Sequence, residues 1–190
     1  MDSHDRQVMF SSEKTDWATP QILFDKLNEE FSFTLDVCAI ADNAKCPTFF
    51  TPEDNGLVQP WTGVCWMNPP YNEPEQPCKK SCKKKKCQRR GCCTTKYIPG
   101  QIDFLRKAHD EVLVFSRAEK VVCLIPSRTD TKYFHDYCMR AKEIRFIEGR
   151  LKFQGAKDAA PFPSALIIFQ RRPFADRSSW PIVSTYNPKR

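Results

Sequence analysis

The sequence has no apolar run long enough to cross a membrane, because its longest apolar stretches, such as residues 164–169, are far shorter than the roughly 20 residues of a spanning helix. It also lacks a secretory opening, since Met1–Arg6 is polar. There is no internal repeat, and 190 residues allow only one well-buried core. We therefore expect a single-domain protein of the reducing cytoplasm, with no membrane partner.

Acidic residues are missing from one short segment, Cys78–Cys93, which carries many positive charges. These cations are Lys79, Lys80, Lys83, Lys84, Lys85, Lys86, Arg89 and Arg90. They exceed the formal net charge of the whole chain, which is +7, so the remainder is nearly neutral. A local basic excess of this kind indicates an element that contacts a polyanion. The alternative is a solvated charge run without a partner.

The chain contains ten cysteines but lacks the paired Cys-x2-Cys spacing of common zinc knuckles. Without an export signal, thiols or metal ligation are favoured over disulfides. Four cysteines at spacings of three and four residues, Cys78, Cys82, Cys87 and Cys92, are candidate ligands of a structural zinc. Cys93 competes with Cys92, and Cys38 or Cys46 could substitute. Reduced thiols without metal remain the alternative.

The hydrophobic pattern alternates between strands and helices, which predicts an α/β fold with a mostly parallel sheet and helices on both faces. We expect helices at 21–31, from 101 to about 117, and at 131–141. We expect strands at 33–39, 63–67, 120–126, 143–147 and 166–170. A flexible arm (1–14) precedes one domain (15–172), which carries a Cys/Lys-rich insertion (74–98) and is followed by a tail (173–190).

Polar side chains stand where two of the expected strands end. Asp36 lies towards the end of the first strand, and Asn68 follows the second. In open sheets of this kind, ligands bind beyond the carboxyl ends of the strands. The pattern therefore predicts a ligand site that contains both residues.

The run Asn68-Pro69-Pro70-Tyr71 is typical of the catalytic loop of an amino-methyltransferase. Two prolines make the loop stiff before any ligand arrives. The Asn68 amide oxygen and the Pro69 carbonyl oxygen could each accept a hydrogen of a planar amino group, which localises its lone pair, while Tyr71 stacks on the ring. The alternative is a structural proline-rich turn after a strand.

Several motifs together make the chain resemble the phage-type DNA N6-adenine methyltransferases, the phage Dam family. They are residues 17–20 (WATP), 35–39 (LDVCA), 43–47 (NAKCP), 50–54 (FTPED), 68–71 (NPPY), 126–131 (PSRTDT) and 149–153 (GRLKF). The resemblance implies a Rossmann-like fold that uses S-adenosylmethionine and acts on a flipped adenine in double-stranded DNA. If the chain is phage-encoded, it implies the host cytoplasm.

The resemblance also implies roles for individual residues. Thr19 and Pro20 would border the methionine end of the cofactor, Asp36 would accept a hydrogen bond from its ammonium group, and Asp54 would contact its ribose or adenine. One departure is the lack of glycine in Val37–Ala41, where many methyltransferases have a glycine-rich turn. Methylation of cytosine N4 or of a protein glutamine, or a non-enzymatic DNA-binding module held together by zinc, are the alternatives.

Overall fold

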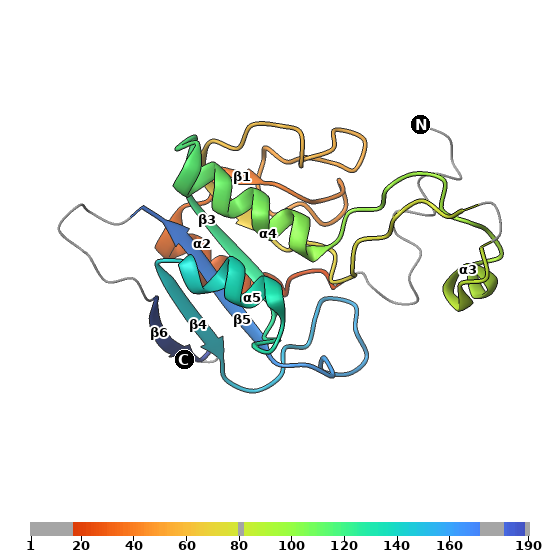
Figure 1. Ribbon diagram of the computed structural model, residues 1–190. Helices are drawn as coiled ribbons and strands as arrows, with labels where there is room; N and C mark the ends of the chain where they lie inside the picture. Colours follow the sequence, from red (N-terminus) through yellow and green to blue (C-terminus); the bar gives the residue numbers. More distant parts are fainter. Residues whose placement is uncertain (1–16, 80–81, 172–180, 189–190) are drawn as a thin grey trace.

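The computed structural model describes residues 17–79, 82–171 and 181–188 of the 190-residue chain, so the arm expected at 1–14 lies outside the described part. A six-stranded sheet lies between helices (Figure 1). Its strands are β1 (Leu35–Asp36), β2 (Gly63–Met67), β3 (Ala118–Pro126), β4 (Glu143–Ile147), β5 (Ser164–Gln170) and β6 (Ile182–Tyr186). The α-helices are α2 (Gln21–Phe31), α3 (Lys85–Arg90), α4 (Gln101–His109) and α5 (Lys132–Asp136).

The strands are arranged in the order β1-β2-β3-β5-β4-β6, and the sheet is mixed. Strand β5 runs antiparallel to both of its neighbours, β3 and β4, whereas the other strand pairs are parallel. The expectation of a mostly parallel sheet thus misses the reversal of β5. Its cause is visible in residues 148–163, which form no helix. A return to the sheet without a helical crossover favours antiparallel pairing.

Helices cover both faces of the sheet, as the sequence predicts (Figure 1). On one face, Phe104 and Leu105 of α4 and Phe134 of α5 pack with alternate residues of β2, β3 and β5. On the other face, Leu23 and Leu27 of α2 pack with the intervening residues of the same strands. Because side chains of a strand alternate between faces, each central strand contributes to both cores. The result is a rigid support for the loops that leave its strands.

Three of the predicted elements have the bounds that the sequence indicates, namely α2, β2 and β4. The helix that begins at Gln101 is shorter than expected, because the chain widens into a π-helical turn at Asp110–Val114. Glu111 in that turn is fully buried, with ion pairs to Lys107 and Arg117 at 2.6 Å each. The ion pairs explain how a carboxylate can be buried there.

The carboxy-terminal segment that we expected to be a tail contributes a strand. Ile182–Tyr186 forms β6, which pairs in parallel with β4 at the edge of the sheet. In the part of the chain that the structure describes, no helix is both long and apolar enough to span a bilayer.

A pocket at the carboxyl ends of β1 and β2

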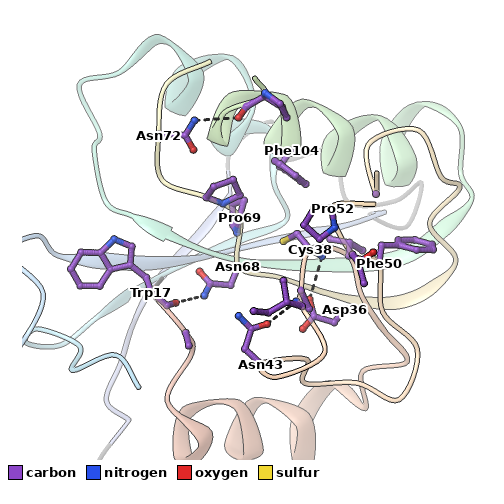
Figure 2. A pocket seen from close by; sticks show the side chains of 18 of the residues that line it. Trp17, Asp36, Cys38, Asn43, Phe50, Pro52, Asn68, Pro69, Asn72 and Phe104 are labelled. Atoms are coloured by element: carbon purple, nitrogen blue, oxygen red, sulfur yellow. Dashed lines mark hydrogen bonds between the residues drawn. The ribbon is translucent and has the colours of Figure 1, made fainter. Parts of the chain in front are cut away.

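A pocket opens where β1 and β2 end, and Figure 2 shows its central side chains. Asp36, the last residue of β1, and Asn68, the first residue after β2, both line it. The two strands are paired in parallel, with Asp36 opposite Trp66. The structure thus brings Asp36 and Asn68 together in one pocket, where the sequence pattern places them.

The Asn68 carboxamide is held by hydrogen bonds on both of its ends. Its Nδ2 donates to the main-chain oxygen of Trp17 at 2.6 Å, drawn in Figure 2, and to Thr19 Oγ1 at 3.1 Å. Its Oδ1 accepts the hydroxyl hydrogen of Tyr71 at 2.7 Å. Thr19 lines the pocket and is 2 % exposed. The network fixes which end of the amide carries the oxygen and where that oxygen lies.

Tyr71 takes a different place from the stacking position that we predicted. Its side chain is buried, and its ring makes edge contacts with Phe153 and Phe162. Its hydroxyl lies 2.7 Å from Asn68 Oδ1 and 3.3 Å from the main-chain oxygen of Leu124. Burial raises the pKa of Tyr71 well above its usual value, so the phenol keeps its proton. Tyr71 does not line the pocket, and its hydroxyl orients Asn68 instead.

Asp36 is a buried carboxylate, 3 % exposed, in the pocket wall. Desolvation raises its pKa to about 6, against the lowering effect of hydrogen bonds from the backbone N–H groups of Lys45 and Cys38. Those N–H groups are 3.1 Å from Oδ2 and 3.3 Å from Oδ1. Each oxygen therefore keeps a lone pair for a further donor. A cationic ligand in this pocket would favour the charged form of Asp36.

Two of the predicted cofactor residues do not line the pocket. Pro20 stands at the N-terminus of α2, where its main-chain oxygen accepts the N–H of Phe24 at 3.1 Å. Asp54 is exposed, and its Oδ2 accepts hydrogen bonds from the backbone N–H and the hydroxyl of Thr51, at 2.8 Å each. These bonds lower the pKa of Asp54. Asp54 therefore closes the loop 51–56, and other residues of that loop line the pocket.

Gly56 supplies the close backbone approach that the sequence after β1 lacks. A Cβ atom at Gly56 would lie 2.3 Å from the main-chain oxygen of Val37, so no larger side chain fits without a shift of the backbone. Sequence reasoning missed Gly56, although a single glycine in an otherwise glycine-free stretch, residues 39–62, is a recognisable signal. The close approach is therefore made between the segment after β1, at Val37, and the loop that contains Gly56.

Cys38 lines the same pocket, but its thiol is a poor nucleophile. Burial and the neighbouring Asp36 carboxylate raise the pKa of Cys38 well above its usual value. At neutral pH it stays protonated, and the thiolate is the reactive form. The residues that line the pocket therefore offer no reactive thiolate.

The Cys/Lys-rich insertion forms a further wall of the pocket. Glu75, Lys86 and Arg90 line it, together with Ile98 and Pro99 at the return of the insertion. The sequence indicates Lys86 and Arg90 only as cations of the basic segment, and it does not indicate Glu75, because these residues reach the pocket through tertiary contacts. The segment is thus part of the site and not merely close to it along the chain.

Four cysteine sulfur atoms of the insertion lie within 4.8 Å of one another, those of Cys78, Cys82, Cys87 and Cys93. Three of them are the ones that the spacing predicts. The fourth differs from our prediction, because the structure brings Cys93 and not Cys92 to the cluster. Sequence spacing cannot distinguish adjacent cysteines, since the backbone direction at the end of the insertion decides which of them points inward.

A family model for DNA N-6-adenine-methyltransferase (Dam) matches residues 7–189, nearly the whole chain. The chain belongs to this family. Among curated relatives, a DNA N-6-adenine-methyltransferase of Haemophilus phage HP1 (strain HP1c1) is 31% identical over 169 residues, which are 84% of this chain and 80% of the relative. The Escherichia coli (strain K12) protein YfdM, named as a putative methyltransferase, is 40% identical over 63 residues, 29% of this chain and 69% of that protein.

Membership makes this Dam-family chain an adenine-specific DNA methyltransferase. It confirms the resemblance that the sequence motifs indicate. It also favours adenine N6 over cytosine N4 and protein glutamine as the methyl acceptor. A purely structural Pro-Pro turn is disfavoured too, because the loop lies in a pocket together with Asp36 and Thr19.

Proposed function

We propose that this enzyme transfers the methyl group of S-adenosylmethionine directly to N6 of an adenine flipped out of double-stranded DNA, and that Asn68 and Pro69 hold the amino group. The observation that carries the proposal is the Asn68 amide, oriented by three hydrogen bonds in the pocket wall. An adenine inside the duplex is out of reach, so it must leave the stack before it reacts.

The hydrogen bonds of Asn68 leave its oxygen as the group available to a substrate. Both hydrogens of Nδ2 are used by Trp17 and Thr19, and Oδ1 keeps one lone pair beyond the bond from Tyr71. That lone pair accepts one N6 hydrogen, and the Pro69 carbonyl accepts the other. The acceptors draw the N6 lone pair out of the ring system and aim it at the methyl group. The transfer is direct and needs no enzyme nucleophile.

The donor set of the pocket fits S-adenosylmethionine, which supplies an activated methyl group on a sulfonium. Asp36 is a buried carboxylate with lone pairs free, and it would hold the cofactor's ammonium group. A cation beside Asp36 offsets the cost of burying that charge. In this interpretation the sheet is the Rossmann-like methyltransferase fold, with the ligand beyond the carboxyl ends of β1 and β2.

The insertion would hold the DNA backbone. Lys83, Lys84, Lys85 and Arg89 are exposed, on or just before α3, whereas Lys86 and Arg90 are engaged with Glu75. Cations near the pocket can pair with phosphates and hold the duplex while the target adenine enters. A structural zinc at the cysteine cluster is the second group that we propose. The location is the cytoplasm of the cell that contains the DNA.

The substitution Asn68→Ala tests the clamp. It removes the amide oxygen and the bonds that orient it, so we expect methyl transfer to fall at least about 100-fold, the loss typical of one transition-state hydrogen-bond partner. Affinity for S-adenosylmethionine and for DNA should stay within about threefold of wild type. Single-turnover transfer from labelled cofactor gives the rate, and titrations give the affinities.

Tyr71→Phe is the matched variant, because it removes only the hydroxyl that orients Asn68. We expect a loss of about fivefold to tenfold in transfer rate, the worth of one neutral hydrogen bond. Asn68→Ala transferring methyl groups at near the wild-type rate would contradict the role of Asn68, whatever Tyr71→Phe does.

A further inference from the structure

The insertion has almost no core of its own. In α3 the buried residue is Cys87, and the neighbouring lysines and arginines are exposed or engaged in ion pairs. A helix of six residues with this many like charges does not persist by itself in water. Apolar burial therefore does not explain the conformation of α3. A cross-link between residues of the insertion would supply the missing constraint.

The four gathered sulfur atoms supply such a cross-link. Those of Cys78 and Cys87 are 3.4 Å apart, too far for a disulfide bond, which is about 2.05 Å long. Four thiolates around a tetrahedral zinc stand about 3.8 Å from one another, which follows from a zinc–sulfur distance of about 2.3 Å. All four sulfur atoms of the cluster lie within 4.8 Å of one another, which is compatible with one zinc ion between them.

The two ends of the insertion, residues 75–78 and 94–98, pair with each other and form a stem. This stem connects the cysteine cluster to the pocket. Glu75 and Ile98 exchange both main-chain hydrogen bonds, at 2.9 and 3.0 Å, and Cys78 N–H donates to Thr94 O at 2.7 Å. Arg90, from α3, donates from Nη2 to both carboxylate oxygens of Glu75 at 3.0 and 3.1 Å. Its Nη1 donates to Thr94 Oγ1 at 2.9 Å. The position of α3 thus determines the position of Glu75 and Arg90 in the pocket wall.

The stem also joins the end of the catalytic loop. The Gln101 N–H donates to Asn72 O at 3.0 Å, and Asn72 Nδ2 donates to Pro99 O at 3.2 Å. A Cβ atom on Gly100 would lie 2.4 Å from Pro74 N, so the two ends of the insertion touch without room for a side chain. The insertion is therefore fixed to the pocket by hydrogen bonds at both of its ends. A displacement of its stem would also displace Asn72, which follows the Pro-Pro loop.

We infer that Cys78, Cys82, Cys87 and Cys93 bind one zinc ion, and that this metal holds the wall of the pocket in place through α3, Arg90 and Glu75. The four thiolates with Zn²⁺ carry a charge of about −2, which reduces the repulsion among the lysines of α3. The metal site rests on the cysteine geometry alone. The coupling to cofactor binding rests in addition on the proposed function.

The choice between adjacent cysteines gives a matched test of the metal site. Metal content of the full-length protein is measured for wild type, Cys93→Ser and Cys92→Ser, with the absorption of bound cobalt(II) as a check on thiolate ligation. We expect about one zinc per chain in wild type and Cys92→Ser, and less than about a tenth of that in Cys93→Ser. Full metal content in Cys93→Ser, or none in wild type after incubation with zinc, would overturn the site.

The coupling is tested on the wild-type protein, so that it does not depend on a variant that folds. Its zinc is removed with a chelator and then restored, and calorimetry measures the affinity for S-adenosylmethionine in each state. We expect removal to weaken binding at least about tenfold and zinc to restore it. Equal affinity with and without zinc would overturn the coupling alone. A zinc-loaded protein that binds no S-adenosylmethionine would overturn both the coupling and the proposed function, and the metal site would stand.

Discussion

At the scale of single residues, the sequence indicates which side chains meet but not how they are used. Asn68 and Asp36 could be assigned to one site because both stand at the carboxyl ends of strands in a predicted sheet, and both line the pocket. The burial of Tyr71 could not be predicted, since it depends on contacts with Phe153, Phe162 and Leu124, far along the chain. The pocket does not include Asp54 for a different reason: Thr51, three residues away, binds its carboxylate and turns it away.

Asp36 predicts a pH dependence of cofactor binding. Desolvation raises its pKa to about 6, so its carboxyl group becomes neutral as the pH falls through that value and no longer attracts an ammonium group. We expect the dissociation constant of S-adenosylmethionine to rise towards about tenfold per pH unit below about 6. Calorimetry between about pH 5 and 7 measures this, in a range where the cofactor's own amino group stays protonated.

Asp36→Asn is the control for that dependence. The amide has nearly the same shape but does not titrate, so the variant should bind weakly at about pH 7 and show a flat profile below it. A wild-type profile that is flat over the same range would show that Asp36 does not hold the ammonium group.

At the scale of elements, the hydrophobic period is enough to predict the bounds of an element that is continuous and packs on one face. Helix α2 has its predicted bounds because Leu23, Leu27 and Phe31 recur at helical spacing and are all buried. The reversal of β5 could not be predicted in this way, because a buried strand has the same apolar pattern in either direction. β6 was missed because its residues are largely exposed and carry little hydrophobic signal.

Helix α3 and the lysines before it predict a salt-dependent contact with DNA. Replacing Lys83, Lys84 and Lys85 by alanine removes up to three cations that can pair with phosphates. The slope of log affinity against log salt should become shallower by about 0.9 for each phosphate that is no longer neutralised. Titrations of duplex DNA at several salt concentrations measure the slope. Zinc content should not change, because none of these lysines is a ligand.

Lys132→Ala serves as the matched control for the lysine variant. This exposed lysine of α5 pairs with Asp136 at 2.5 Å, outside the insertion. We expect it to leave the salt slope as in wild type. If the triple variant keeps the wild-type slope, the insertion is not the element that contacts the phosphates.

At the scale of the whole molecule, the site is assembled from two parts with different sources of order. The sheet and its helices bury two apolar cores, and they position Asp36, Thr19 and Asn68. The insertion adds Glu75 and Arg90 and depends on polar and sulfur contacts. The first part could be inferred from periodicity. For the second part, the sequence predicts only that a Cys- and Lys-rich insertion exists. Its cysteines and cations do not specify how the chain folds or which of its residues reach the pocket.

In the proposed function, this pocket turns an unreactive aromatic amino group into a methyl acceptor. To test this, the wild-type enzyme is incubated with isotope-labelled S-adenosylmethionine and duplex DNA that contains all four bases. The DNA is then digested, and the labelled nucleoside is identified. We expect the label in N6-methyladenine, as the proposed function requires. Label in N4-methylcytosine instead, or no label in DNA from a protein that binds both ligands, would contradict it.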